Sequence, residues 1–171
     1  AVYNVVDRPP TYVLVRGNHE RPALQVHPRS PQVLSLPKTH NLFAHESKSR
    51  TVLVRWLTDR ESPAAALMAR VVVNRAWQKL FGRGLVETTD NFGRNGATPS
   101  HPELLEWLAA EFVESGWDYK KLLRLMVNSR VYLQQSNWDS QTHEADPANV
   151  LLARMPLRQL ESEAVRDAIL H

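Results

Sequence analysis

Three polar residues in the middle of the chain, Arg70, Asn74 and Arg75, have types and spacing from which a binding site could be built. Arg70 and Asn74 are four residues apart and would share one face of a helix, with Arg75 beside them. An asparagine amide can orient a ligand while an arginine clamps a carboxylate, a sulfate or a haem propionate. Alternatively, these side chains pair with Asp90 and with backbone carbonyls to hold down the loop that follows. We favour this second interpretation, because a long ordered loop must satisfy its backbone polar groups.

A glycine-containing segment, NFGRNGATPSHPE, supplies a second candidate. Arg94 and the free N–H groups at the start of the next helix could hold an anion. Alternatively, Gly93 and Gly96 provide positive φ in turns, and Ser100 with Glu103 forms a capping box that satisfies the helix end. Glu103 would repel an anion, and the phosphate-binding pattern G-x-x-x-x-G-K-[ST] is absent. We therefore favour a structural role here as well.

Histidines give little support for catalysis or metal binding. His101 follows Ser100, which suggests a serine hydrolase, but there is no G-x-S-x-G motif, and neighbouring side chains at a helix start diverge by about 100°. His40 and His45 lie near Glu46 without any H-E-x-x-H pattern. We predict no catalytic residue and no metal site in the chain. Whether it forms part of an enzyme stays open.

The elements that would position these residues are mainly helical. Periodic apolar residues from Ser47 onward predict a mainly α fold of about five packed helices. Ser62 and Asp118 are suited to cap two of the helices, and Gly82 and Gly116 to end two of them. The predicted helices are residues 47–59, 62–82, 100–116, 118–136 and one beginning near Leu157. Candidate core residues on them are Val52, Leu53, Trp56, Leu57, Ala69, Val72, Val73, Ala76, Trp77, Leu80, Leu104, Leu105, Leu108, Ala109, Phe112, Leu122, Leu125, Met126, Val127, Leu157, Leu160, Ala164, Val165 and Ala168.

The first part of the chain has a different character. Six prolines within residues 1–40 prevent a long helix there. TYVLVRG (Thr11–Gly17) alternates and predicts a strand, and PQVLSLP predicts a second short extended piece. We expect an extended N-terminal arm, residues 1–46, with one or two short strands. We expect it to join a helical domain, residues 47–171, in one structural unit.

Composition excludes several classes of protein. The 171 residues are 43% hydrophobic and carry a net charge of +3, which is too small to predict nucleic-acid binding. There is no cysteine and no apolar run near the roughly 20 residues of a membrane span. The chain opens on Ala1 without a methionine and stops at His171 inside a helical pattern. We expect a piece of a longer protein that is truncated at its C-terminus.

Several longer motifs resemble a known family. They are NR-x-W, LFGRGLV, the Asp-Asn-Phe-Gly segment, S-HPELL-WLA-EF and a final R-L-x-x-E-x-x-RDA. Together with TYVLVRG they resemble the domain of unknown function numbered fifteen fifty-three, the C-terminal planctomycete-specific domain of large multidomain proteins. The resemblance extends from Thr11 over nearly the whole chain. Asn91 departs from it, because an aspartate is more usual there.

The resemblance implies a context and no activity. Members often follow a second planctomycete-specific domain and an upstream cytochrome c-like domain, so it implies haem c in a neighbouring domain and none within this chain. It also implies a periplasmic or extracellular location. We expect a non-catalytic interaction or scaffold domain whose partners are neighbouring domains of the same polypeptide, with an anionic ligand or polysaccharide as a further partner. The alternative is an accessory part of a redox or polysaccharide-related enzyme whose active site an upstream domain completes.

Overall fold

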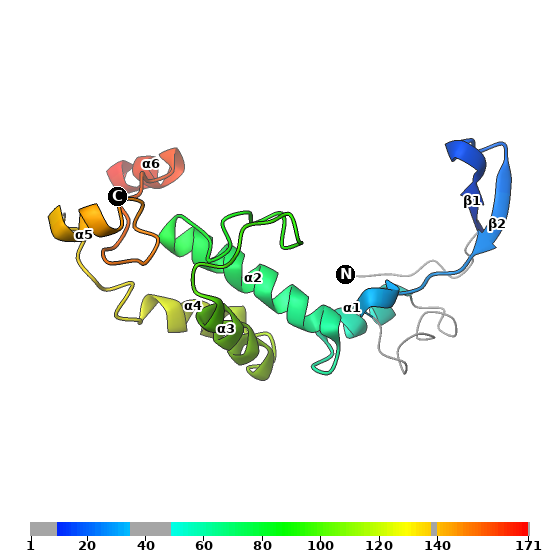
Figure 1. The fold of residues 1–171 in the computed structure, drawn as a ribbon, viewed down its shortest axis with the longest axis horizontal. Helices are drawn as coiled ribbons and strands as arrows, with labels where there is room; N and C mark the ends of the chain where they lie inside the picture. Colours follow the sequence, from blue (N-terminus) through cyan, green and yellow to red (C-terminus); the bar gives the residue numbers. More distant parts are fainter. Residues whose placement is uncertain (1–9, 35–48, 138–139, 171) are drawn as a thin grey trace. The chain divides into compact units, whose positions relative to one another are not determined.

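Helices predominate in the computed structural model of this protein, which describes residues 10–34, 49–137 and 140–170. Figure 1 shows six helices and one short two-stranded sheet in these ranges. The predicted mainly α fold with an N-terminal strand region is therefore confirmed. The chain falls into two units, residues 1–69 and 70–171.

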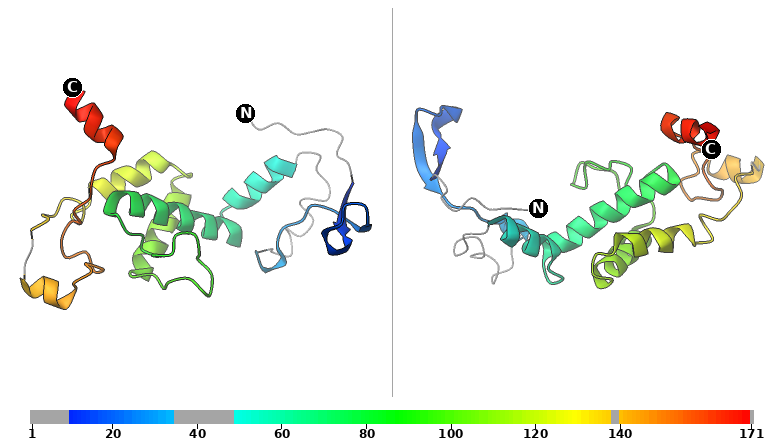
Figure 2. Two further views of the ribbon diagram at one scale, coloured as in Figure 1. Left: turned by 90° about the horizontal axis from the view of Figure 1, so that it is seen from above. Right: turned by 180° about the vertical axis from the view of Figure 1, so that it is seen from behind.

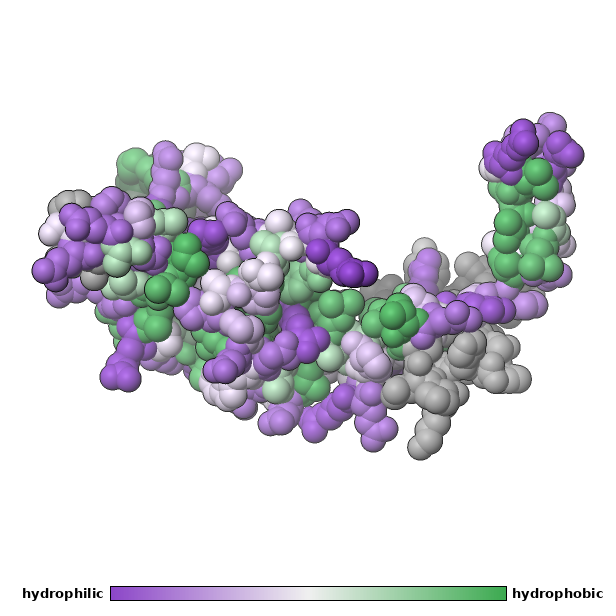
Figure 3. All heavy atoms as spheres, in the orientation of Figure 1, coloured by the Kyte–Doolittle hydropathy of each residue, from purple (hydrophilic) through white to green (hydrophobic). Residues whose placement is uncertain are grey.

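The first unit begins with a β-hairpin. β1 (Thr11–Leu14) pairs antiparallel with β2 (Pro22–Val26). The first strand was predicted, but the second lies earlier than the predicted PQVLSLP segment. There, Gln32–Leu34 forms a 3-10 turn, and the rest of the segment lies outside the described residues. A proline is tolerated at the first residue of a strand, which explains Pro22. Figure 3 shows green apolar residues along the strands and purple residues at the turn.

Two helices follow in sequence. α1 (Ser49–Thr58) places Val52 and Trp56 in a small core with Ala64, whereas Leu53, predicted to face inward, is exposed. α2 (Pro63–Phe81) begins as predicted, because the backbone N–H of Ala64 donates to Ser62 Oγ at 3.2 Å. The predicted start of α1 at Ser47 lies outside the described residues.

The second unit contains α3 (Pro102–Glu114) and α4 (Tyr119–Val127), which contact each other. As predicted, Gly116 terminates α3, because it follows the C-cap Ser115 with a φ of +76°. The Asp118 side chain caps α4 by accepting from Lys121 N at 3.0 Å. The prediction of a helix to residue 136 is wrong. Ser129 Oγ donates to the Met126 carbonyl at 2.6 Å, and this local bond competes with continuation of the helix.

The C-terminal part also differs from the prediction. α5 (Ser140–Ala145) lies between the last two predicted helices, where no helix was predicted, and α6 (Ser162–Leu170) begins five residues after Leu157. Arg158 explains the late start, because its guanidinium donates to the Lys79 carbonyl near the end of α2 and so holds the preceding segment there. Every residue of α6 that the structure describes is exposed, so Ala164, Val165 and Ala168 are not core residues, and Leu157 and Leu160 before the helix are exposed as well.

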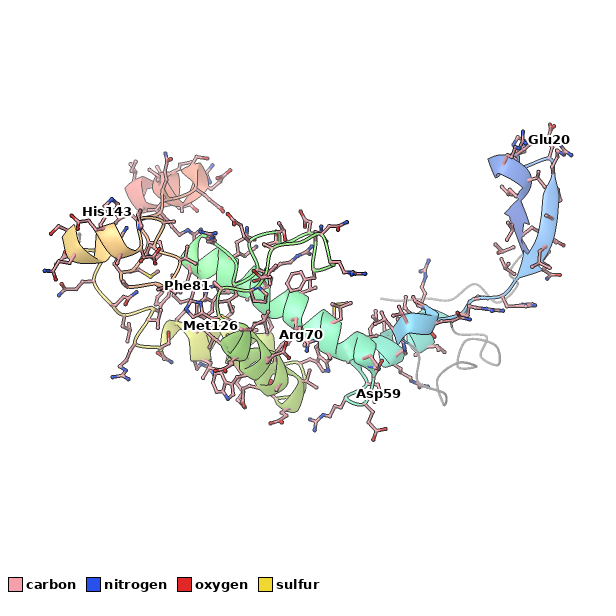
Figure 4. The ribbon with its side chains drawn as sticks, viewed as in Figure 1. Glu20, Asp59, Arg70, Phe81, Met126 and His143 are labelled. Atoms are coloured by element: carbon pink, nitrogen blue, oxygen red, sulfur yellow. The ribbon has the colours of Figure 1, made fainter. Side chains whose placement is uncertain are left out.

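The core of the second unit contains side chains from α2, α3 and α4 and from the loop between α2 and α3. Trp77 and Phe81 stack with ring centroids 4.0 Å apart, and Tyr132 meets Phe81 edge-on at 5.8 Å. Phe81 and Met126, labelled in Figure 4, are among the largest fully buried side chains. The buried residues among those that the structure describes in this unit are Val73, Asn74, Ala76, Trp77, Phe81, Gly84, Leu85, Val86, Leu105, Leu108, Ala109, Phe112, Leu122 and Met126. This core fixes the positions of the candidate site residues on α2 and its loop.

Candidate functional site

Asn74 is fully buried and bonded to the loop after α2. Its Nδ2 donates to the Val86 carbonyl at 2.9 Å, and its Oδ1 accepts from the Val86 N–H at 2.8 Å. The side-chain amide thereby satisfies both backbone polar groups of Val86, as a neighbouring β-strand would. Gly84 permits this approach, because a Cβ there would lie 2.8 Å from Asn74 Nδ2. The geometry is that of the second interpretation, in which Asn74 satisfies loop backbone.

Arg70 faces α3 and forms a two-bond ion pair with Glu106. Arg70 Nε donates to Glu106 Oε1 and Nη2 donates to Oε2, both at 2.6 Å. The hydrogen bonds from Arg70 lower the pKa of the Glu106 carboxyl from its ordinary value, and the same contact raises the pKa of Arg70. The Arg70 guanidinium that was considered as a clamp for a ligand carboxylate therefore binds the carboxylate of Glu106 in this chain.

Arg75 and Asp90 meet as predicted, but at the surface. Arg75 Nη2 lies 3.3 Å from Asp90 Oδ1, and the Asp90 side chain is 92% exposed. Such an exposed pair contributes little stability, since water and salt screen it. Arg94 is also exposed, and it makes no hydrogen bond or ion pair with any described residue. The buried Asn74 and these exposed groups therefore do not form one concave polar cluster.

The loop between α2 and α3, drawn in green in Figures 1 and 2, is held by its own bonds. Thr88 Oγ1 donates to the Asn91 carbonyl at 2.8 Å and accepts from Ala97 N at 2.8 Å. Gly96 fits closely, because a Cβ there would lie 2.1 Å from the Asn91 carbonyl oxygen. The prediction that Gly93 and Gly96 have positive φ is wrong. Gly96 is required because the backbone of Asn91 leaves no space for a side chain there.

Ser100 closes the loop instead of capping α3. Its backbone N–H donates to the Leu85 carbonyl at 2.8 Å, and its hydroxyl donates to the same carbonyl at 3.3 Å. The capping-box prediction is wrong, since His101 occupies the N-cap and makes no side-chain cap bond. Pro102 at the first helical position removes one of the N–H groups that would need a cap.

The contact between Ser100 and His101 is not arranged for nucleophilic catalysis. His101 Nδ1 lies 3.0 Å from Ser100 Oγ. Which of these two atoms donates depends on the histidine tautomer, and Ser100 Oγ also lies 3.3 Å from the Leu85 carbonyl oxygen, to which it can donate. Among the described residues no carboxylate bonds to His101, so the group that orients the base of a triad is missing.

The first region that sequence reasoning missed is a groove between α3 and α4. We call it the α3–α4 groove, with a volume of about 520 Å³. The indole of Trp107 is 53% exposed beside it and Leu125 is 37% exposed, although Leu125 was predicted to face inward. On the rim, Lys121 Nζ lies 3.1 Å from Glu111 Oε1. The lining residues are Trp77, Leu104, Trp107, Leu108, Glu111, Lys121, Arg124, Leu125, Met126, Asn128, Ser129 and Val131. The signal that could have revealed it is Trp107, which widens the predicted apolar stripe of α3 beyond Leu104 and Leu108.

A second cavity, of about 450 Å³, lies beside the end of α2. Trp77, Phe81 and Ser100 line one part of it, and Asn149 and Arg158 line another. The side chain of Asn149 forms an internal hydrogen bond, because its Nδ2 donates to the Arg154 carbonyl at 2.8 Å. None of the predicted ligand-binding residues lines this cavity.

The described residues contain no group of three or more His, Asp or Glu side chains placed to hold a metal ion. His40, His45 and Glu46 lie outside the described residues, so the structure says nothing of them. Within the same described ranges, no helix has the length and apolar character needed to cross a bilayer.

The fold and these contacts define a small helical domain with an internally bonded polar loop and an apolar groove. Residues 49–171 match the sequence model of PSD1, described as a protein of unknown function (DUF1553). The match covers more than half of the chain, so the chain belongs to this family, as its motifs predicted. The matched range does not include the predicted likeness at Thr11–Gly17. No curated protein and no solved structure matches the chain.

Proposed function

We propose that this chain is a non-catalytic interaction domain that binds a protein partner through the α3–α4 groove. The observation that carries the proposal is the exposure of Trp107 and Leu125 over an apolar groove of about 520 Å³. Aromatic residues at the centre of an interface contribute much of its binding energy, and exposed apolar patches mark binding surfaces. The polar candidates support the same function indirectly, because Arg70 and Asn74 use their hydrogen-bonding groups inside the unit.

The context of the domain is also a proposal. The family resemblance supports a longer, exported polypeptide in which a cytochrome c-like domain precedes this one. Neighbouring domains of the same polypeptide are then further partners of this domain, and one of them binds haem c. Absorbance of the protein purified from its native source tests this proposal. A Soret band with covalent haem on a chain longer than 171 residues is expected, and a haem-free product would contradict the cytochrome link.

The alternative, an accessory part of a redox or polysaccharide-related enzyme, needs convergent polar groups. Asn74, Asp90, Arg94 and His101 would have to face one ligand. Asn74 is instead fully buried, and the Asp90 side chain is 92% exposed. This alternative stays a prediction, and a ligand screen tests it.

The melting temperature of the chain distinguishes the two functions. The panel contains phosphate, sulfate, sulfated and neutral polysaccharides, divalent metals, haem and short DNA. A ligand present at 100 times its Kd stabilises a protein by about 2.7 kcal/mol, which shifts a melt clearly. An interaction domain gives a flat response across the panel. An upward shift that Arg94→Ala abolishes would make the glycine loop a ligand site and would contradict the proposal.

A further inference from the structure

We propose that the α3–α4 groove of one copy of this chain receives helix α6 of a second copy. This inference rests on the proposed function, because it names the occupant of the same groove. It would make the chain a two-fold dimer in which each copy gives one helix and receives one.

The groove has the form of a site for one short helix. α3 and α4 span roughly 20 Å and 13 Å at 1.5 Å per residue, and α6 spans roughly 13 Å. Leu104, Trp107 and Leu125 offer apolar surface along the groove. A helix whose apolar side chains repeat every three or four residues fits such a surface.

Helix α6 carries the complementary apolar face. Ala164, Val165, Ala168 and Ile169 follow each other at intervals that place them on one side of a helix. Ile169 is 77% exposed and Val165 is 41% exposed, so this face lacks a covering element in the structure. A fully exposed helix of nine residues is marginal in water, and packing of its apolar face would stabilise it.

Charges at the rim match the flank of α6. Arg124 lines the groove and has no ion pair within the described part of the chain, while Lys121 beside it is paired with Glu111. On α6, Asp167 borders the apolar face three residues after Ala164. Its only partner among the described residues is the neighbouring Arg166, at 3.0 Å in an exposed pair. Asp167 can therefore exchange this weak pair for Arg124 of the other copy.

A second copy is the occupant because the chain before α6 is anchored elsewhere. Arg158 donates to the Lys79 carbonyl at the end of α2, and Met155 N donates to the Gln135 carbonyl at 3.0 Å. Only three residues separate Arg158 from α6, and Figure 1 shows α6 apart from α3 and α4. Reciprocal exchange between two copies makes both contacts at once, as a two-fold interface requires.

The absence of cysteine permits a clean cross-linking test. A Leu125→Cys chain is mixed with an Ile169→Cys chain and oxidised. We expect a disulfide-linked product of twice the chain mass that exceeds the product of either variant alone at least tenfold. Leu133→Cys, exposed but outside the groove lining, replaces Leu125→Cys as the control and should cross-link to background level. Equal yields from the groove and control variants would overturn the proposal.

Sedimentation velocity of the same chain gives an independent measure of association. The unmodified chain should dimerise with rising concentration, and Arg124→Glu should weaken the dimer about tenfold. Combining Arg124→Glu with Asp167→Lys should restore it, which a merely misfolded variant would not do. A chain that stays monomeric at all concentrations would overturn the proposal. So would an internal disulfide in a chain that carries both Leu125→Cys and Ile169→Cys.

The two proposals fail in different ways. If the chain is monomeric but amide exchange in α3 and α4 slows when a neighbouring domain is added, the groove binds another partner and only this occupant is wrong. If the chain is monomeric and exchange in the groove never slows, the interaction function is wrong as well.

Discussion

At the scale of single residues, Asn74 has the most constrained environment of the candidate site. It is fully buried, and its amide uses a donor and an acceptor on one residue of the loop. Removing that amide leaves the N–H and the carbonyl of Val86 buried without partners. Such groups cost more than the lost bonds themselves, because water cannot replace the partner.

Asn74→Ala should therefore lower the free energy of unfolding by about 1–3 kcal/mol, measured by urea denaturation. Arg75→Ala on the exposed side of the same helix is the control and should change stability by less than about 0.5 kcal/mol. Equal stability of the Asn74→Ala chain and the unmodified chain would remove Asn74 from its structural role.

Gly96 and Gly93 provide a matched pair in one loop. Gly96→Ala places a methyl group against the Asn91 carbonyl oxygen, so the backbone must move, and the unfolding free energy should fall by about 1–3 kcal/mol. A Cβ at Gly93 would meet only the end of the Asn91 side chain, at 3.2 Å, and Gly93→Ala should cost less than about 0.5 kcal/mol. Thermal and urea unfolding of both variants checks the order, and a costlier Gly93→Ala would contradict the loop geometry.

At the scale of elements, the Arg70–Glu106 pair joins α2 to α3 and should make stability depend on pH. The pKa of Glu106 is lowered in the folded chain from its ordinary 4.5. Its contribution is therefore fully present above about pH 4.5 and is lost as the pH falls through the lowered pKa. A double-mutant cycle with Arg70→Ala and Glu106→Ala should give a coupling of about 0.5–1 kcal/mol at pH 7, since both groups are partly exposed. A coupling that persists unchanged at pH 2 would contradict the ion pair.

The start of α4 depends on one side chain, Asp118. Its carboxylate accepts from Lys121 N, so Asp118→Ala should cost about 1 kcal/mol of unfolding free energy. Asp118→Asn keeps an oxygen acceptor in the same place and should lie near the unmodified chain in a urea titration. If both variants lose the same stability, the charge of Asp118 matters and the cap does not.

At the scale of the whole molecule, the parts that could be predicted are those with local signals. Apolar periodicity with Ser62, Gly116 and Asp118 located α2, the end of α3 and the start of α4 correctly, because caps act within one turn. The end of α4 and the start of α6 were wrong. Both depend on contacts that no periodicity contains, namely the Ser129 side-chain bond and the reach of Arg158 to Lys79.

The sequence predicted the pairing of the polar candidate residues, but it did not predict the groove. The pairing of Arg75 with Asp90 and the bond of Asn74 to loop backbone match the structural interpretation of the polar residues. The groove was missed because Trp107 and Leu125 look like core residues in the sequence. Only the packing of α3 on α4 decides which apolar side chains remain exposed.

The central claim, that the groove and not the polar loop is the binding surface, is tested most directly by amide hydrogen exchange. Exchange is measured for this chain alone at low concentration and within the longer polypeptide. We predict slower exchange in residues 102–131 of the longer polypeptide, because a partner covers the groove, and unchanged exchange in residues 91–97. Slower exchange in residues 91–97 with no change in residues 102–131 would contradict the claim and make the glycine loop the functional surface.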